Sequence, residues 1–250
     1  SRSAAGLFGS LTTASPPAAK ANAKAAVFSA ETPDDGKKDG PLAPATLVTF
    51  ANTCVDAVAN DPNKPAAERE QMLARARDLY QQALAREPKS VDALLGLGRM
   101  YHISGEAAKV AEVERRLKAE HPKDAKVWGW MAVRAGQAKQ WDTAIQCYHT
   151  AAKLDPDNRV YRTHLGFTLA RVGRYREGYE WLKTSMKEAN ARYSLAQMQI
   201  HNGHVEVAQE ELARALEAEP GFKPARDQLM ALSGGAAAAP GVRTVGHDGQ

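Results

Sequence analysis

Prolines recur at a fixed interval in the middle of the chain. Pro88, Pro122 and Pro156 are spaced 34 residues apart, and the next proline in the series, Pro220, follows 64 residues later. The last interval equals one period of 34 residues plus a shortened one of 30, with the shortening placed near Asn190. A constant period of this length is typical of stacked repeats, in which each unit buries its apolar face only against its neighbours.

Residue size follows the same period between the prolines. One position of each unit is small, as expected where two helices approach closely: it holds Gly98, Ala132, Gly166 and Ala196. Later in each unit, small and large residues stand at i, i+4 and i+7, which share one face of a helix. These positions are Ala76, Tyr80 and Ala83; Ala144, Tyr148 and Ala151; and Ala208, Leu212 and Ala215. With β-branched and aromatic residues sparse, the sequence predicts an all-α fold built from helix pairs.

Turn-forming residues mark the ends of the predicted helices. Ser90, Asp124 and Asn158 each stand two residues after a proline, where a side-chain oxygen can cap the first turn of a helix. Glycines mark the short turn inside three of the helix pairs: Gly105, Gly173 and Gly203.

Together these features resemble the tetratricopeptide-repeat family over residues 45–232. The resemblance implies antiparallel helix pairs stacked into a right-handed superhelix, an α-solenoid, with the first helix of each pair lining an inner groove. We expect four and a half to five pairs and a C-terminal capping helix over about residues 222–232. Segment 60–65 departs from the family as a longer loop. Arg162 and Arg192 depart too, because they stand where a large apolar residue is usual, and their guanidinium groups are expected to reach water.

The two ends of the chain differ from its middle in composition. Residues 1–44 and 233–250 are rich in Ala, Gly, Pro or Ser and lack a sustained apolar period. We predict that both are disordered tails, since they cannot bury enough apolar surface to offset chain entropy. The numbering begins at Ser1 and not at Met, which leaves open a removed leader or an N-terminal tether, and the acid-free first 30 residues share the bias of a transit peptide.

Charge and hydropathy argue against two classes of partner. The 33 basic and 29 acidic residues are interleaved and give a net charge of only +4. Nucleic-acid binders concentrate basic charge on one face, so no nucleic-acid partner is predicted. No stretch approaches the roughly 18 apolar residues of a membrane span, so none is predicted either.

The sequence lacks the motifs of common catalytic and cofactor sites, including phosphate-binding glycine loops, nucleophile elbows, zinc-protease helices and paired cysteines. Cys147 and His149 lie two positions apart on a predicted helix and therefore face different directions. Cys54 and Cys147 are predicted to be free and buried. We predict a protein that is not an enzyme, with no catalytic residue and no cofactor.

Two segments suggest metal binding at first sight. His201 and His204 bracket a turn, but no cysteine or carboxylate cluster stands near them to complete a site. Residues 154–158 contain two acids, yet the segment is too short for a calcium loop and suits a turn between helices. No metal site is predicted.

The first helices carry an apolar and aromatic stripe opposite their predicted core face. Aromatic residues and arginine are enriched at binding hot spots, so the stripe is predicted to bind a partner peptide or helix. The alternative left open is that Trp130 and Phe167 only pack against neighbouring repeats or against a folded-back tail. The stripe consists of Leu95, Arg99, His102, Trp130, Val133, Gln137, His164, Phe167, Arg171, Tyr193, Gln197 and His201.

The groove lacks one feature known from the family. Tetratricopeptide domains that clamp the C-terminal carboxylate of cytosolic chaperones use Lys and Asn at fixed groove positions. The matching positions here are Leu95, Arg99, Trp130, Val160 and His164. The carboxylate clamp is therefore expected to be absent, and an apolar or helical segment is the expected ligand.

The sequence thus predicts a protein-interaction scaffold or adaptor whose partner is a protein or peptide of unidentified sequence. A second hypothesis is a tethered assembly factor of a bacterial envelope machine, such as a pilus or a secretion system, and it rests on the family resemblance. For the same reason the cell envelope or periplasm is favoured over the cytoplasm.

Overall fold

The computed structural model describes residues 42–236, and all the regular structure in this range is helical. The predicted tails, residues 1–44 and 233–250, lie outside the described range apart from the few residues that belong to or adjoin its first and last helices. The helices are α2 (Pro44–Ala59), α3 (Ala66–Arg86), α4 (Val91–Ile103), α5 (Ala107–Glu120), α6 (Ala125–Gln137), α7 (Trp141–Leu154), α8 (Arg159–Arg171), α9 (Tyr175–Leu182), α10 (Glu188–His201), α11 (Val205–Ala218) and α12 (Lys223–Ala236).

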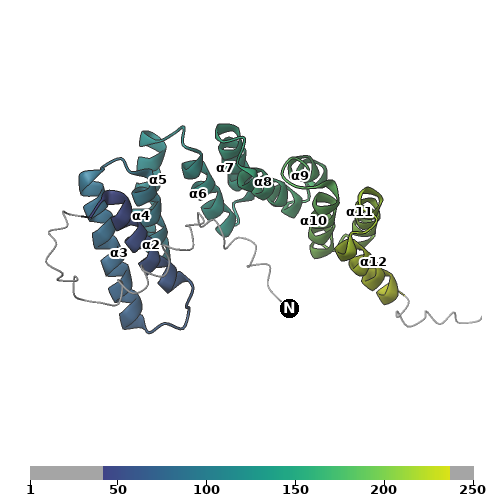
Figure 1. The fold of residues 1–250 in the computed structure, drawn as a ribbon, viewed down its shortest axis with the longest axis horizontal. Coiled ribbons are helices and arrows are strands. Elements are labelled where there is room, and N and C mark those ends of the chain that lie inside the picture. Colours follow the sequence, from purple (N-terminus) through teal and green to yellow (C-terminus); the bar gives the residue numbers. More distant parts are fainter. Residues whose placement is uncertain (1–41, 237–250) are drawn as a thin grey trace, which may run out of the picture. The chain divides into compact units, whose positions relative to one another are not determined.

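The predicted all-α architecture of helix pairs is confirmed. Four pairs of consecutive helices pack together, namely α2/α3, α4/α5, α8/α9 and α10/α11, and the last described helix, α12, packs against α11. The described residues divide into two compact units, unit 1 up to Trp130 and unit 2 from Met131, with the boundary inside α6. Consecutive helices pack side by side from α2 to α5 in the first unit and from α7 to α12 in the second (Figure 1). No described helix is both long and apolar enough to cross a membrane.

The core of each unit is built from the helix faces that the period predicts. Tyr80, Leu94 and Leu117 are buried in unit 1, and Tyr148 and Leu212 are buried in unit 2. The small positions lie at close helix contacts: a Cβ atom added to Gly166 would lie 2.7 Å from Cγ of Leu182. The size pattern was therefore a correct guide to packing.

The turns inside the pairs show why glycine recurs there. Gly105, Gly173 and Gly203 have φ angles of 76°, 83° and 84°, in the left-handed region that glycine adopts without steric cost. In the turn between α6 and α7, which has no glycine, Lys139 takes φ 59° and is the one non-glycine residue with positive φ within residues 42–236.

Two of the three predicted helix caps are confirmed. Oδ1 of Asp124 accepts a hydrogen bond from the amide of Lys126 at 2.8 Å, and Oδ1 of Asn158 accepts one from the amide of Val160 at 3.0 Å. For Ser90 the predicted N-cap position before α4 is confirmed, but the capping hydrogen bond is not.

The shortened repeat lies slightly earlier than predicted. Helix α9 has 8 residues, whereas α5, α7 and α11 each have 14. It ends at Leu182, whose carbonyl accepts hydrogen bonds from the Ser185 hydroxyl at 2.9 Å and from the Met186 amide at 3.0 Å. Asn190 is already inside α10. Counting from the prolines pointed to Asn190 because no proline or glycine marks the true end of α9 in the sequence.

At four junctions between helices, a side-chain donor forms a hydrogen bond with a proline carbonyl. The Arg162 guanidinium makes this contact at the surface, where it donates to the Pro156 carbonyl. Trp128, Arg162 and Arg226 each stand six residues after the proline, where an indole or a guanidinium can supply the N–H group, whereas Arg116 reaches Pro88 from α5. The pairs are Trp128 to Pro122 at 2.7 Å, Arg226 to Pro220 at 2.6 Å, Arg162 to Pro156, and Arg116 to Pro88.

Candidate binding site

The predicted stripe is divided between the two units, which are described separately. None of its twelve residues is buried, and three are exposed: His102, Gln137 and His201. Unit 1 holds Leu95, Arg99, His102 and Trp130; unit 2 holds Val133, Gln137, His164, Phe167, Arg171, Tyr193, Gln197 and His201.

The two aromatic residues at the centre of the unit 2 stripe have a packing role. Phe167 of α8 lies against a buried cluster that includes Leu195 and Met198 of α10. Tyr193 packs against a second buried cluster, and its ring meets that of Phe222 edge-on at 5.6 Å between centroids. Both rings stay partly exposed. Packing between neighbouring repeats, the alternative left open above, therefore accounts for part of the surface of Phe167 and Tyr193. The rest of each ring faces solvent.

His164 of α8 stacks on a buried tyrosine. Its ring lies 5.4 Å from the ring of Tyr148, with 14° between the planes. Burial lowers the pKa of His164, so near neutral pH the imidazole is uncharged. The Tyr148 hydroxyl is buried and has no hydrogen-bond partner among the described residues. His164 thus contributes a flat neutral ring to the stripe.

The polar residues of the unit 2 stripe differ in the contacts that their side chains make. The guanidinium of Arg171 lies 5.3 Å above the ring of Trp141. The Gln197 amide donates to the Gln228 side chain at 3.4 Å, while His201 is exposed at the end of α10. No aspartate or glutamate belongs to this stripe, so the face it forms is neutral to weakly basic.

In unit 1, Trp130 fills the space beside a glycine. A Cβ atom added to Gly98 would lie 2.7 Å from Cζ2 of Trp130 and 3.2 Å from Cγ1 of Val113. The indole therefore packs closely on α4. Removing it would leave a cavity, so truncation at this position tests packing and binding together.

Unit 1 also contains a polar cluster that was only partly predicted. We define the polar cluster as Asn52 and Asp56 of α2, Tyr80 of α3 and Arg99 of α4. The Tyr80 hydroxyl donates to Oδ1 of Asn52 at 2.5 Å, and Nη1 of Arg99 donates to Oδ1 of Asp56 at 2.6 Å. Sequence reasoning found Arg99 but missed the two α2 residues. Helix α2 precedes the first proline of the series, and nothing in the sequence fixes its register against α4.

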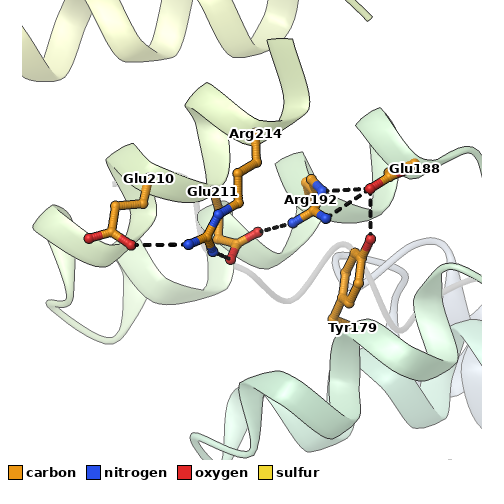
Figure 2. Close-up of polar contacts among 6 residues, drawn as sticks. All are labelled: Tyr179, Glu188, Arg192, Glu210, Glu211 and Arg214. Atoms are coloured by element: carbon orange, nitrogen blue, oxygen red, sulfur yellow. Dashed lines mark hydrogen bonds and ion pairs between the residues drawn. The ribbon is translucent and has the colours of Figure 1, made fainter. Parts of the chain in front are cut away.

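Unit 2 contains a more deeply buried set of charges, shown in Figure 2. We define the ion network as Tyr179, Glu188, Arg192, Glu210, Glu211 and Arg214. Arg192 donates to Glu188 at 2.8 Å and to Glu211 at 3.1 Å, and its guanidinium lies 4.6 Å above the Tyr179 ring. Arg214 donates to the other oxygen of Glu211 at 2.6 Å.

The ion network overturns the expectation that the Arg192 guanidinium reaches water. Its side chain is only 19% exposed, because two carboxylates and an aromatic ring satisfy the guanidinium inside the unit. Hydrogen bonds from Arg192 and Tyr179 lower the pKa of Glu188. The network ties α9, α10 and α11 together and includes no stripe residue.

The thiols and the possible metal ligands form no further site. Cys54 and Cys147 are buried and form no disulfide in the described part of the chain, as predicted, and burial raises the pKa of the Cys54 thiol. Within residues 42–236 no group of three or more His, Cys, Asp or Glu side chains is placed to hold a metal ion.

Residues 67–133 match the family model of the tetratricopeptide repeat. The peroxisomal targeting signal receptor of Eremothecium gossypii is 30% identical over 95 residues, which cover 38% of this chain and 17% of that protein. The receptor of the same name from Kluyveromyces lactis is 27% identical over 92 residues, 37% of this chain and 16% of that protein. The chain thus spans roughly a sixth of the length of these relatives.

Solved structures with similar arrangements are also found. YrrB, described as a TPR protein with an unusual peptide-binding site, has a TM-score of 0.48 at 18% identity, covering 73% of this chain and 89% of that one. A thermophilic TPR protein of Thermus thermophilus has a TM-score of 0.46 at 18% identity, covering 76% of this chain and 99% of that one.

Proposed function

We propose that the chain, whose residues 67–133 match the tetratricopeptide-repeat model, is a non-enzymatic scaffold that binds a polypeptide segment of a partner along the stripe on its first helices. The main anchors lie in unit 2, on α8 and α10. The stripe residues of unit 1, on α4 and α6, are proposed as a separate contact surface for the partner. The observation that carries it is the pair of partly exposed rings, Phe167 and Tyr193, on neighbouring first helices.

The chemistry of this face supports a polypeptide ligand. Phe167 and Tyr193 are held in place by their packed edges, so their exposed surface is preorganised, and rigid aromatic surface is the main component of binding hot spots. Arg171 and His201 add donors without any carboxylate. The expected segment is therefore apolar, with neutral or acidic flanks. The partial likeness to proteins named as receptors of a targeting signal favours the same ligand class.

The proposal is tested with peptides selected from a random display library against the whole chain. Phe167→Ala is expected to weaken the selected peptides about thirtyfold, which corresponds to about 2 kcal/mol. Because Phe167 also packs on Leu195 and Met198, thermal unfolding is recorded for every variant.

Tyr175→Ala is the matched control. Tyr175 packs on the same cluster from α9 but is not a stripe residue, so its loss is expected to lower stability and leave peptide affinity nearly unchanged. Equal weakening in both variants would mean that only stability had changed. An unchanged affinity in Phe167→Ala would contradict the proposal directly.

The alternative role as a tethered assembly factor of a bacterial envelope machine stays a prediction. It would use the same binding face, and the identity of the partner that this face captures distinguishes the two roles.

A further inference from the structure

The polar cluster of unit 1 contains an amide whose orientation is fixed by a buried side chain. Tyr80 is fully buried, and its hydroxyl donates to Oδ1 of Asn52 at 2.5 Å. A Cβ atom added to Gly96 of α4 would lie 2.5 to 2.6 Å from the end of the Tyr80 ring, so the phenol passes α4 only because glycine stands there. With Oδ1 occupied, the Asn52 amide nitrogen is directed away from Tyr80 as a donor of two hydrogens.

The other two residues of the polar cluster, Arg99 and Asp56, form an ion pair near the surface. Arg99 donates from Nη1 to Asp56 at 2.6 Å, and the two side chains are 35% and 39% exposed. A guanidinium has five N–H donors, and this bond uses one of them. Because Asp56 offsets the charge of Arg99, the cluster presents oriented donors from Asn52 and Arg99 with no net charge.

We infer that the polar cluster binds main-chain carbonyl groups of a polypeptide, through the amide nitrogen of Asn52 and the remaining N–H groups of Arg99. The ligand class rests on the proposed function, while the site is new and belongs to unit 1. A carbonyl is a neutral acceptor and suits neutral donors. A carboxylate or phosphate would lie beside Asp56 and would be repelled by it.

The site recognises the polypeptide without reading its sequence. Main-chain carbonyls occur at every residue, so Asn52 and Arg99 supply affinity and position, whereas the side chains of the ligand are distinguished elsewhere. Since Tyr80 is held in the core, little conformational entropy is lost when the ligand binds to Asn52.

The test uses the whole chain and the peptides selected by display. Asn52→Leu is expected to weaken at least one selected peptide about tenfold, and Tyr80→Phe, which frees the Asn52 amide to rotate, to weaken the same peptide about threefold. Tyr148→Phe is the matched control, because Tyr148 occupies the same repeat position and its hydroxyl has no partner among the described residues. Its affinity is expected to equal that of the wild type.

Nitrogen-15 spectra separate direct binding from a structural effect. The side-chain amide signals of Asn52, assigned by their absence in Asn52→Leu, are expected to shift when the selected peptide is added. Signals that do not shift, or selected peptides that all bind Asn52→Leu as tightly as the wild type, would overturn the inference.

The outcomes also separate this inference from the proposed function. Peptides weakened by Phe167→Ala but not by Asn52→Leu would leave the proposed binding face standing and remove the polar cluster from it. Peptides weakened by Asn52→Leu but not by Phe167→Ala would support the polar cluster and contradict the proposed binding face. A library that yields no binding peptide would contradict both.

Discussion

The polar cluster of unit 1 and the ion network of unit 2 use the same kinds of group in opposite ways. Each joins an arginine to a carboxylate beside a tyrosine. Arg99 and Asp56 are 35% and 39% exposed, whereas Arg192 and Glu211 are 19% and 10% exposed. Water competes for the exposed pair, which therefore adds little stability and keeps donors free for a ligand. The buried pair, Arg192 and Glu211, holds helices α10 and α11 together, because either partner alone would be an uncompensated buried charge.

Tyr80 of unit 1 and Tyr148 of unit 2 also differ in the contacts of their hydroxyl groups. Tyr80 and Tyr148 are two periods apart and equally buried, but the helix that follows each carries a different residue at the corresponding position. Gly96 lets the Tyr80 hydroxyl reach Asn52, whereas His164 stacks on the Tyr148 ring. One residue on the neighbouring helix thus decides whether the phenol supports a polar surface or an aromatic one.

The largest expected difference between the units concerns their arginines. Arg192→Ala is expected to lower the free energy of unfolding by about 3 kcal/mol, because Glu211 is left buried with part of its compensation removed. Arg99→Ala is expected to cost less than about 1 kcal/mol, as for other exposed pairs. Guanidinium chloride denaturation of both variants provides the measurement. Equal losses would show that burial does not distinguish the two sets of charges.

A smaller difference is expected between the tyrosines. Tyr80→Phe removes a hydrogen bond to Asn52 and is expected to cost about 1 kcal/mol. Tyr148→Phe removes a buried hydroxyl with no partner in the described part of the chain and is expected to be neutral or slightly stabilising. Thermal and chemical unfolding measure both effects. A large loss in Tyr148→Phe would contradict the description of its hydroxyl.

The turns of the two units are expected to respond in opposite directions. Lys139→Gly relieves a left-handed conformation that glycine adopts freely, and it is expected to stabilise unit 2 by about 0.5 kcal/mol. Gly105→Ala introduces the same strain in unit 1 and is expected to cost about 1 kcal/mol. Differential scanning calorimetry of the two variants would detect the opposite shifts in Tm. A destabilised Lys139→Gly would show that the lysine side chain contributes more than its backbone strain costs.

The smallest expected effect is a pH dependence specific to unit 2. Burial against Tyr148 lowers the pKa of His164, so the folded state favours the neutral imidazole. The resulting contribution to stability is fully present above the unfolded pKa of about 6.5 and is lost as the pH falls below it. Unfolding measured near pH 7.5 and near pH 5 should therefore differ more for the wild type than for His164→Gln. Identical pH profiles would contradict this role.

Local features of the fold were predictable because neighbouring residues determine them. The 34-residue period located the helix pairs, and the turn at Gly105 followed from residue type, since a tight turn in the left-handed region selects glycine wherever it occurs. The burial of Tyr80 and Tyr148 followed from their place on a helical face. The end of α9 was misplaced because no residue type marks it.

The sequence by itself determined the helix pairs, their turns and the faces that meet in the core, because each depends on the spacing of residues along one helix or turn. Only the tertiary structure decided which polar groups meet. Asn52 and Tyr80, Asp56 and Arg99, and Arg192 and Glu211 are separated by 28, 43 and 19 residues. Their hydrogen bonds depend on helix register and burial, and these are set when whole helices pack, not by any local pattern.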